Sequence, residues 1–524
     1  MLGGHSLQAM MLMSRMHKEF EIQVQLREIF KAPTVGELAE YVKTLEKIKF
    51  FSIQPADERE YYPVSSAQKR MYILNQLEEK QTSYNITGMA ILEGRLDLEH
   101  FEEVIKTLIR RHEAFRTSFS VIDGMPVQII HRDVDFKMGY MDADEEKVAE
   151  MEEEFIRPFD LNQAPLVRID LVRTAENRHV MFSDMHHIIS DGVSMDILIT
   201  EMGKLYRKEE LPDLRIQYKD FSVWQNGLSE RGIIHEQEKY WRGVFNKEIP
   251  VLNLPVDYPR PVVQSFEGDS ISLVLDMQLS RGLKRLAGEM GTTLYMLLLA
   301  AYNVLLSKYT GQEDIVVGTP IAGRQHADSE GILGIFVNTL AMRNYPSGEK
   351  TFKEFLKEVR KNCIKAYENQ DYQFEELIEK LNIQKDLGRN PLFDTMFMVQ
   401  NNDICEMEMG DLRFIPYNFD NKTAKFDITV EVTEKNEEIR LGFNYSTRLF
   451  KRETIERFGG HFVNILWHVE EQPSIKLSKI DVISGAEAEK LLHTFNNTGA
   501  EYPRDKTYKR CSRSRWQRHR TILQ

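Results

Sequence analysis

Cysteine is scarce in this chain, whose 524 residues include only three, Cys363, Cys405 and Cys511. They lie far apart and form no CxxC pair, so they supply neither a disulfide framework nor a thiolate metal site. The most apolar stretch, Tyr295–Tyr302, is too short for a membrane span and predicts a buried helix. The N-terminus lacks the basic and apolar regions of a signal peptide. These absences favour a reducing cytosol, with neither a metal nor a membrane partner.

Basic side chains are outnumbered, because 68 Lys and Arg face 81 Asp and Glu and give a net charge of −13. Such a chain is a poor general nucleic-acid binder, so no nucleic-acid partner is expected. Basic residues nevertheless gather after Lys506, with no acidic residue among them. That stretch has neither a helical nor a strand period. We interpret residues 508–524 as a vector-derived extension rather than a nucleic-acid-binding arm.

The first 60 residues differ in pattern from the rest. Residues 1–46 predict two or three short helices, the last of them opened by a capping box at Thr34 and Glu37 and running to about Glu46. This is too little for an independent domain, so we expect the C-terminal part of a small helical domain. Residues 47–60 have the mixed charge of a linker, with a proline at Pro55.

From Tyr61 onward, helical and strand patterns alternate, which predicts an α/β (α+β) fold. The expected helices are Ser66–Leu77, Leu98–His112 and Thr293–Lys308. The expected strands are Gly88–Leu92, Pro126–His131, Val167–Val172, His179–Met185 and Ile315–Gly318. Several prolines in residues 225–265 indicate a crossover between two lobes, 61–235 and 265–485.

The sharpest motif is HHIISDG, which runs from His186 to Gly192 between a predicted strand and a predicted helix. A near-neutral imidazole on such a turn is suited to take a proton from an attacking amine or hydroxyl. Asp191 could orient it, or could pair elsewhere and hold the turn, and the glycine allows close approach of a substrate. A packed core histidine and a metal site are the alternatives, although no further His/Cys cluster completes a ligand set.

At this motif the chain resembles the condensation domains of nonribosomal peptide synthetases, most closely those of the tyrocidine type. Seven motifs of the family occur in its order, and they begin at Ser65, Arg111, His186, Tyr218, Gly334, Asn369 and Gly388. Gln373, where the family more often has proline, and Gly388, often serine there, depart from the pattern. The resemblance covers about 330 residues within the expected domain 61–485.

Both ends extend the resemblance. The segment LGGHSL resembles the carrier motif whose serine, here Ser6, is loaded with 4′-phosphopantetheine, although Ser6 could also be only a helix N-cap. A phosphopantetheinyl transferase is then an implied partner. Residues 486–507, with FNNT at Phe495–Thr498, resemble the start of an adenylation domain. Together these imply a carrier end, a condensation domain and an adenylation start.

The resemblance implies that the amine of an aminoacyl thioester on the downstream carrier attacks an upstream peptidyl or aminoacyl thioester. His187 is then the catalytic residue, either as general base or by hydrogen-bonding the amine and the tetrahedral intermediate. His186 is structural, and Gly192 offers its N–H to the oxyanion. Asp191 caps the following helix or pairs with an arginine, for which Arg70 is the first candidate and Arg116 the second. Asn338 is a weaker site candidate whose alternative role is a strand-end hydrogen bond.

The implied fold is a two-lobed, chloramphenicol acetyltransferase-like pseudodimer with a tunnel between its lobes. A carrier joined directly to the condensation domain, with His5 before Ser6, implies an L-configured donor. The implied partners are the upstream and downstream carrier and adenylation domains, and we expect a monomeric fragment. The rival interpretations are an epimerisation domain, a CoA-dependent acyltransferase and a non-catalytic docking module. The motifs after Gly334 and the intact HHIISDG favour condensation.

Overall fold

Two compact units make up the chain, residues 1–480 and residues 481–524. The computed structural model describes residues 6–32, 34–77, 82–230, 232, 234–383, 386–400, 406–417, 422–435 and 437–498. In the second unit it shows α15 (Gly485–Glu489), followed by a π-helical turn over Lys490–Thr494. The predicted tail, 508–524, and the last part of the predicted adenylation start, from 499, lie outside the described residues.

Three helices form the N-terminal segment: α1 (Ser6–Phe20), α2 (Leu26–Lys31) and α3 (Val35–Val42). Their small core contains Met16, Ile22 and Val24. The capping box is confirmed, because the Thr34 side chain accepts the Glu37 N–H while the Glu37 carboxylate accepts the Thr34 N–H. Helix α3 ends earlier than expected, at Val42. The segment therefore has a core of its own, but a small one.

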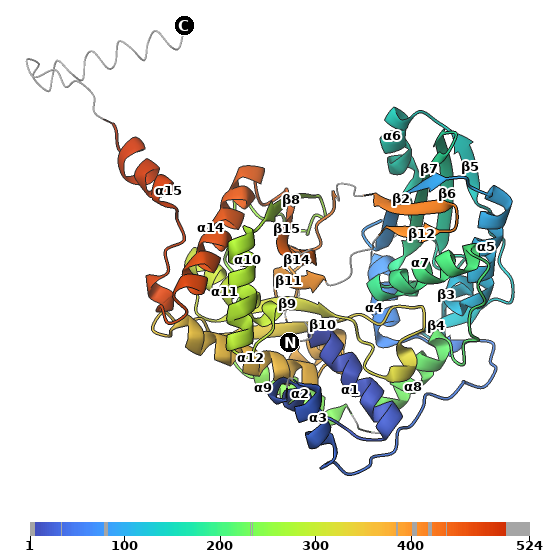
Figure 1. The fold of residues 1–524 in the computed structure, drawn as a ribbon, viewed down its shortest axis with the longest axis horizontal. Helices are drawn as coiled ribbons and strands as arrows, with labels where there is room; N and C mark the ends of the chain where they lie inside the picture. The colour runs from blue at the N-terminus through green and yellow to red at the C-terminus, as the bar shows by residue number, and fades with distance from the viewer. Residues whose placement is uncertain are drawn as a thin grey trace, which may run out of the picture. The chain divides into compact units, whose positions relative to one another are not determined.

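The N-terminal lobe is built on a six-stranded sheet with the strand order β12-β13-β2-β7-β6-β5 (Figure 1). Its first-lobe strands are β2 (Asn85–Gly94), β5 (Gly139–Asp142), β6 (Val167–Ala175) and β7 (Arg178–His186). The helices of this lobe are α4 (Ser66–Leu77), α5 (Leu98–Arg111), α6 (Val148–Phe155), α7 (Gly192–Tyr206) and α8 (Tyr218–Glu230). The next helix, α9 (His235–Val244), packs against the C-terminal lobe, where the Trp241 indole N–H donates to the Asn369 carbonyl at 2.7 Å. A small sheet, β1-β4-β3, adds β1 (Tyr62–Pro63), β3 (Thr117–Ile122) and β4 (Met125–Ile130). Helices of this lobe pack one face into its hydrophobic core. In α5, Phe101, Ile105 and Leu108 lie on that face.

The C-terminal lobe holds a second six-stranded sheet with the order β10-β9-β11-β14-β15-β8 (Figure 1). Its strands are β8 (Gly268–Val274), β9 (Ile315–Ile321), β10 (Asn338–Asn344), β11 (Thr395–Gln400), β14 (Ile428–Lys435) and β15 (Glu438–Ser446). Its helices are α10 (Met277–Glu289), α11 (Leu294–Thr310), α12 (Phe352–Glu368), α13 (Phe374–Leu381) and α14 (Arg452–Glu471). The two sheets with their helices confirm the predicted two-lobed α/β fold.

Two strands cross from the second half of the sequence into the first lobe. Strands β12 (Met407–Met409) and β13 (Leu412–Tyr417) join the N-terminal sheet, where β13 pairs antiparallel with β2. The register places Leu412 opposite Gly94. The expected division into 61–235 and 265–485 did not include this exchange of strands. The lobes are therefore fastened together by backbone hydrogen bonds as well as by side-chain packing.

Helix α11 contains the most apolar stretch, and it is a buried helix as predicted. Thr293 caps its first turn by accepting the Met296 N–H, and Gly311 ends it with a φ of 70°, which glycine adopts without strain. Every residue from Tyr295 to Leu306 is buried. Among the described residues, no single helix passes a length and hydropathy test for crossing a membrane; α10 and α11 pass it only as a pair bent by 106°.

Candidate active site

The HHIISDG motif forms a tight turn between β7 and α7. His186 is the last residue of β7, a 3-10 turn follows over His187–Ile189, and α7 begins at Gly192. The Asp191 carboxylate caps α7 by accepting the Ser194 N–H at 2.8 Å. The expected strand–turn–helix arrangement is therefore present, and the N-terminal amides of α7 open toward the turn.

The two histidines have different surroundings. His186 is 2% exposed, lies edge-on to Phe159 and accepts the Ile188 N–H on Nδ1 at 3.1 Å. His187 keeps accessible surface, and its Nδ1 lies 2.9 Å from the Ser190 carbonyl oxygen. A carbonyl can only accept, so Nδ1 of His187 carries the proton and Nε2 has a free lone pair. Of the pair, His187 alone offers an available ring nitrogen to a substrate.

Burial lowers the pKa of both rings. The pKa of His186 falls to about 3 through burial and through the neighbouring charges of His187 and Lys425. Burial, followed by the charge of Lys425, also lowers the pKa of His187. Both imidazoles are therefore neutral at physiological pH. A neutral His187 can accept a hydrogen bond from an amine or hydroxyl.

Asp191 pairs with Arg324, which sequence reasoning did not identify. Arg324 Nη2 lies 3.0 Å from Asp191 Oδ1, and both side chains are 5% exposed. Asp191 Oδ2 accepts the Phe336 N–H at 2.9 Å, and the Arg324 guanidinium lies 3.9 Å from the centroid of the Phe336 ring. Asp191 thus both caps α7 and forms an ion pair. The pair links the HHIISDG turn to the segment before β10.

The two arginines proposed as partners of Asp191 are engaged elsewhere, so this prediction was wrong. Arg70 pairs with Glu375 at 3.0 Å and lies over the ring of Phe374. Arg116 donates to backbone carbonyls, including that of Ile109 at 3.3 Å. Arg70 and Arg116 both belong to motifs that precede HHIISDG in the sequence. The actual partner lies 133 residues beyond Asp191 in the sequence.

Gly192 has open space beside it, whereas the Asn338 side chain is engaged in hydrogen bonds. An added Cβ at Gly192 would meet no atom within 4 Å, so space lies in front of this first residue of α7. Asn338 begins β10, and its amide nitrogen donates to the carbonyls of Gln370 and Tyr372 at 2.9 and 3.0 Å. Its amide oxygen accepts the Phe374 N–H at 3.2 Å. Asn338 therefore matches its alternative role, a strand-end hydrogen-bonding residue.

Two further charged residues near the motif carried no sequence signal. Lys425 lies 4.9 Å over the ring of Tyr84, and burial lowers its pKa to about 8, with a contribution from the charge of Arg70. Asp184, fully buried on β7, pairs with Arg168 at 2.8 Å. Burial raises the pKa of Asp184 to about 7 against the opposing charge of Arg168. Asp184 lies two residues before His186 on β7, whereas Lys425 acts on both histidines from a distant part of the sequence.

A cleft of about 780 Å³ opens beside the site, and both lobes contribute to its walls. Its lining includes Ser65, Arg70, Trp224, Phe336, Asn338 and Gln370. His187 does not line this cleft. Phe336 does, and its backbone N–H binds Asp191, so the cleft wall and the catalytic turn share one hydrogen bond. A volume of this size suits an elongated organic ligand.

Ser6, the expected attachment site, is the first residue of α1, and the first turn of this 15-residue helix has no acidic residue. The helix N–H groups and dipole at such an end favour a phosphate ester, so the position fits a phosphopantetheine group. The preceding His5 lies outside the described residues. Within the described ranges, no group of three or more His, Cys, Asp or Glu side chains is placed to hold a metal ion.

Two family models match the sequence. Residues 58–492 match the model described as "Condensation domain", and residues 1–42 match "Phosphopantetheine attachment site". These ranges adjoin the expected linker, 47–60. The expected lobe and tail boundaries remain predictions.

The relatives come from bacterial antibiotic synthetases. The chain is 51% identical to gramicidin S synthase 2 of Brevibacillus brevis over 97% of its length, which spans 11% of that protein. It is also 51% identical to tyrocidine synthase 3 of Brevibacillus parabrevis, over 97% of this chain and 8% of that one. Among solved structures, the X-domain in a complex with OxyB from teicoplanin biosynthesis aligns with a TM-score of 0.77 at 25% identity, over 83% of this chain and 99% of that one.

Proposed function

The chain belongs to the condensation domains of nonribosomal peptide synthetases, enzymes that form amide bonds, and we propose that its own reaction joins two carrier-bound thioesters. The upstream carrier presents an L-configured peptidyl or aminoacyl group. The amine of an aminoacyl group on the downstream carrier attacks the thioester carbonyl. The new C–N bond replaces the C–S bond, and the upstream carrier's arm leaves as a free thiol that takes up one proton while the amine gives one up. The observation that carries the proposal is the complete HHIISDG turn, with the Nε2 lone pair of His187 available.

The chain's carrier segment has 4′-phosphopantetheine as its cofactor. Joined to Ser6, this group would supply the thiol that carries the acyl donor as a reactive thioester. The 780 Å³ cleft is our candidate path for such an arm, because its volume suits an organic ligand and both lobes line it. Ser65 at its wall is held by the Tyr218 hydroxyl at 2.8 Å, which makes that wall rigid.

His187 acts, in our proposal, mainly by accepting a hydrogen bond from the attacking amine. A lowered pKa makes its imidazole a weak base, and a free amine is already nucleophilic. Orientation of two bound reactants can by itself supply a large part of the rate. The amine loses its proton as the new bond forms, and Nε2 of His187 is the acceptor nearest the turn. His186 keeps the turn in shape through its hydrogen bond to Ile188.

Gly192 is our candidate for stabilising the carbonyl oxygen on which negative charge develops. Its N–H is in the first turn of α7, where the helix amides have no intrahelical acceptor, and a ligand can approach the backbone closely because the residue has no side chain. Asp191 is a positioning residue. It fixes the start of α7 through Ser194 and holds the turn through Arg324, without contacting the substrate itself.

The remaining partners follow from the same assignment. We propose that the chain works with the upstream and downstream carrier and adenylation domains of one synthetase, and that a phosphopantetheinyl transferase loads Ser6. A bacterial cytoplasmic location is supported by the origin of the relatives and by Cys363, a free and fully buried thiol. The match to the condensation model favours condensation over the epimerisation and docking-module alternatives.

Replacement of His187 tests the catalytic assignment. With both carriers loaded, we expect His187→Ala to lower dipeptide formation by about 10²–10⁴-fold, the contribution of one positioned proton acceptor. The matched control is His235→Ala, an exposed histidine at the start of α9 that should leave the yield unchanged. Circular dichroism checks that both variants fold. Full product yield from folded His187→Ala protein would exclude His187 as the catalytic residue.

A further inference from the structure

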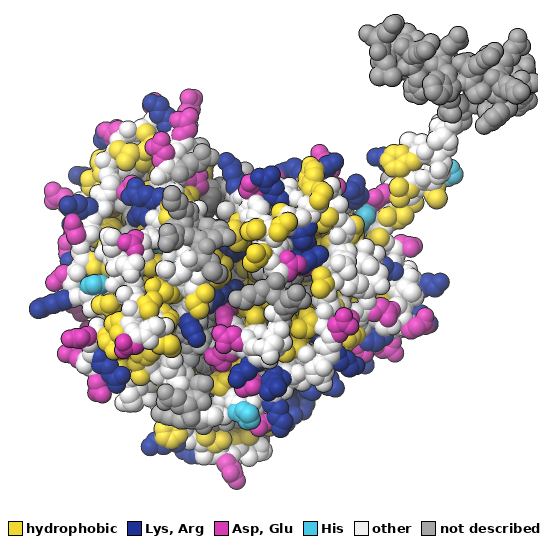
Figure 2. All heavy atoms as spheres, turned by 180° about the vertical axis from the view of Figure 1, so that it is seen from behind, with side chains coloured by type: hydrophobic (Ala, Val, Ile, Leu, Met, Phe, Trp, Pro, Cys, Tyr) yellow, Lys and Arg dark blue, Asp and Glu magenta, His cyan; other side chains and the backbone are white. Residues whose placement is uncertain are grey.

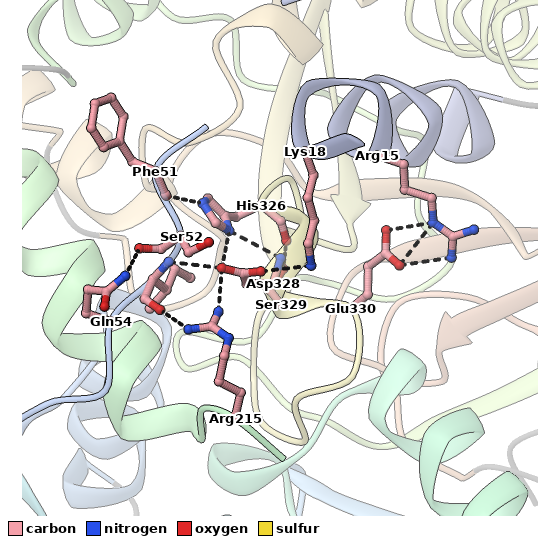
Figure 3. A network of polar contacts seen from close by, with 11 residues as sticks. Arg15, Lys18, Phe51, Ser52, Gln54, Arg215, His326, Asp328, Ser329 and Glu330 are labelled. Carbon is pink, nitrogen blue, oxygen red and sulfur yellow. Dashed lines mark hydrogen bonds and ion pairs between the residues drawn. The ribbon is translucent and has the colours of Figure 1, made fainter. Parts of the chain in front are cut away.

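A short acidic segment before β10 contacts three parts of the chain that are distant in sequence. We call residues 324–330 the clamp segment; it contains a 3-10 turn over Ala327–Ser329. The carboxylates of Asp328 and Glu330 face basic side chains of α1, as Figure 3 shows. Residues 51–54 pass on its other side. The carrier segment, the linker and the condensation domain therefore meet at one place.

Asp328 is the centre of this meeting. Its carboxylate lies 3.0 Å from Lys18 Nζ of α1, 2.6 Å from Arg215 Nη2 and 3.0 Å from the backbone N–H of Ile53, which donates to it. The Asp328 side chain is only 3% exposed, whereas that of Lys18 is 42% exposed. Burial opposes ionisation of Asp328, but the hydrogen bonds from Lys18 and Ile53 keep its pKa below the ordinary value. The carboxylate is charged and receives partners from all three parts.

Glu330, unlike Asp328, pairs with the carrier segment alone, through Arg15. It receives Arg15 Nη2 at 2.9 Å and Arg15 Nε at 3.1 Å, the two-pronged geometry of an arginine–carboxylate pair. The Arg15 side chain is 62% exposed and that of Glu330 is 25% exposed. An ion pair with so much solvent access is weak and is screened by salt. Together with Lys18–Asp328, it supplies the charge contacts of α1 with this segment.

Aromatic rings fill the space between α1 and the condensation domain. Phe50 of the linker lies edge-on to His17 of α1, with ring centroids 5.2 Å apart, and tilted against His326 at 4.7 Å. His326 in turn lies 5.1 Å from Trp224. Trp224 also lines the 780 Å³ cleft. The docked carrier helix thus continues a row of rings that reaches the cleft wall.

The linker is held in a different way from the carrier helix. Ile53 has no exposed surface and packs into the core of the N-terminal lobe. Its carbonyl accepts from Arg215 Nη1 at 2.6 Å, and the next fixed point is the Ala56 N–H, which donates to Asp220 at 2.8 Å. Buried apolar area and backbone hydrogen bonds are less sensitive to salt than exposed ion pairs. As the salt concentration rises, the contacts of the linker should therefore persist after the ion pairs of the carrier helix have broken.

The clamp segment is rigid before anything docks on it. The Arg324 guanidinium donates through Nη1 to the carbonyls of Ser329 and Ile332 at 2.7 and 2.6 Å. Through Nη2 it binds Asp191. Gly323 next to it has a φ of 64°, and a Cβ there would be 1.9 Å from the Phe336 carbonyl oxygen, so only glycine fits this approach. The same guanidinium that holds the catalytic turn thus shapes the docking surface.

We propose that the clamp segment is a reversible docking site for helix α1 of the carrier. Two ion pairs whose basic side chains are exposed, Arg15–Glu330 and Lys18–Asp328, hold the docked carrier and break when it leaves, and Asp328 then keeps its pairing with Arg215. Residues 51–56 stay fixed to the condensation domain throughout, so residues 43–50, which follow α3, serve as the tether. The proposal rests on the carrier role given above but not on any chemistry at His187, because docking is independent of substrate.

Distance measurements by electron paramagnetic resonance can test the proposal on the full chain. Spin labels at Val35→Cys on α3 and Val121→Cys on β3 report carrier docking, since these positions are 71% and 51% exposed. A second protein, with labels at Glu58→Cys and Val121→Cys, reports the linker. Cys405 and Cys511 are replaced by serine. No loaded substrate is present, so failure of condensation activity cannot affect the result.

We expect a narrow distribution of the Val35–Val121 distance at low salt. At about 0.5 M salt, where the Debye length is only a few Å, the population of molecules with a displaced carrier should be several-fold larger. Glu330→Gln and Lys18→Gln should produce the same displacement at low salt. The charge swap Arg15→Glu with Glu330→Arg should restore the narrow distance. The Glu58–Val121 distance should stay narrow in every case.

Three results would overturn the proposal. In the first, Glu330→Gln and Lys18→Gln keep the distance distribution of the parent chain at low salt. In the second, the charge swap behaves like the single Arg15→Glu variant. In the third, the linker distance broadens together with the carrier distance, which would mean that the linker and carrier leave as one body.

Discussion

Asp191 and Glu330 each bind an arginine at a similar distance, yet the two ion pairs differ in how much solvent reaches them. The Asp191–Arg324 pair is 3.0 Å long with both side chains 5% exposed. The Glu330–Arg15 pair is 2.9 Å long with side chains 25% and 62% exposed. The first lies beneath the catalytic turn, and the second joins the carrier helix to the clamp segment. Distance alone does not separate them, whereas solvent access does.

The contrast shows how one kind of contact can serve opposite purposes. A buried charge that loses its partner cannot recruit water, so the buried pair can break only at a high cost in free energy. An exposed pair exchanges its partner for water and salt at little cost. The molecule uses the buried pair where the geometry has to stay fixed and the exposed pair where, in our proposal, a domain has to leave.

The largest expected effect comes from breaking the buried pair. Arg324→Met should leave the Asp191 carboxylate buried and unpaired, which lowers the free energy of unfolding by about 3–5 kcal/mol. Urea denaturation followed by circular dichroism measures the loss. The double variant Asp191→Asn with Arg324→Met removes the uncompensated charge and should recover part of the stability. If the single variant is as stable as the parent chain, the pair does not hold the turn.

Acid should destabilise the catalytic turn through His186. Its pKa is about 3 in the folded chain and about 6.5 when unfolded, so the unfolded state binds the proton first as pH falls. The stability due to the neutral ring is present above pH about 6.5 and is lost progressively below it. His186→Asn, whose amide oxygen can still accept the Ile188 N–H, should lose less stability between pH 7 and pH 4. Equal acid sensitivity of both proteins would contradict this.

Lys425 provides a test of the electrostatics around His187. Its charge contributes to the lowered pKa of His187, second to burial, so Lys425→Met should raise that pKa. Histidine nitrogen shifts of ¹⁵N-labelled protein, followed through a pH titration, measure it directly. Lys425→Arg keeps the charge and is the control. An unchanged titration in Lys425→Met would mean that burial alone lowers the pKa.

We expect a small effect on stability from the ion pairs between α1 and the clamp segment, because Asp328 keeps Arg215 as a partner when Lys18 is removed. Lys18→Gln should change the free energy of unfolding by at most about 1 kcal/mol, because the Lys18 side chain is 42% exposed. Denaturant titration of the whole chain measures this, and Lys43→Gln in an exposed pair of α3 is the control. A loss as large as that of Arg324→Met would remove the distinction between the two regions.

Local signals predicted much of the fold. Helix α4 spans Ser66–Leu77 as the apolar spacing indicated, and the capping box at Thr34 is present. Each of these depends on neighbours a few residues away, which a sequence displays directly. The strand–turn–helix context of HHIISDG was predictable for the same reason, whereas the different roles of His186 and His187 were implied only by the family resemblance.

Contacts between distant segments were not predictable in the same way. The pairing of β13 with β2 joins Leu412 to Gly94, and nothing local in either strand specifies its partner. Arg324 was missed because many arginines could reach Asp191 in principle and only the fold selects one. Lys425 enters the electrostatics of the site through a loop between β13 and β14. These residues acquire their roles from tertiary packing and not from a motif.

Amide-bond formation between two carrier-bound groups is the reaction that we propose for this chain. Mass spectrometry of both carriers, after mixing the chain with loaded partners, tests it most directly. We predict a lengthened acyl chain on the downstream carrier and loss of the donor from the upstream carrier, with neither change in His187→Ala. Unchanged masses on both carriers after incubation with the folded parent chain would contradict the claim, as expected for an epimerising or purely docking domain.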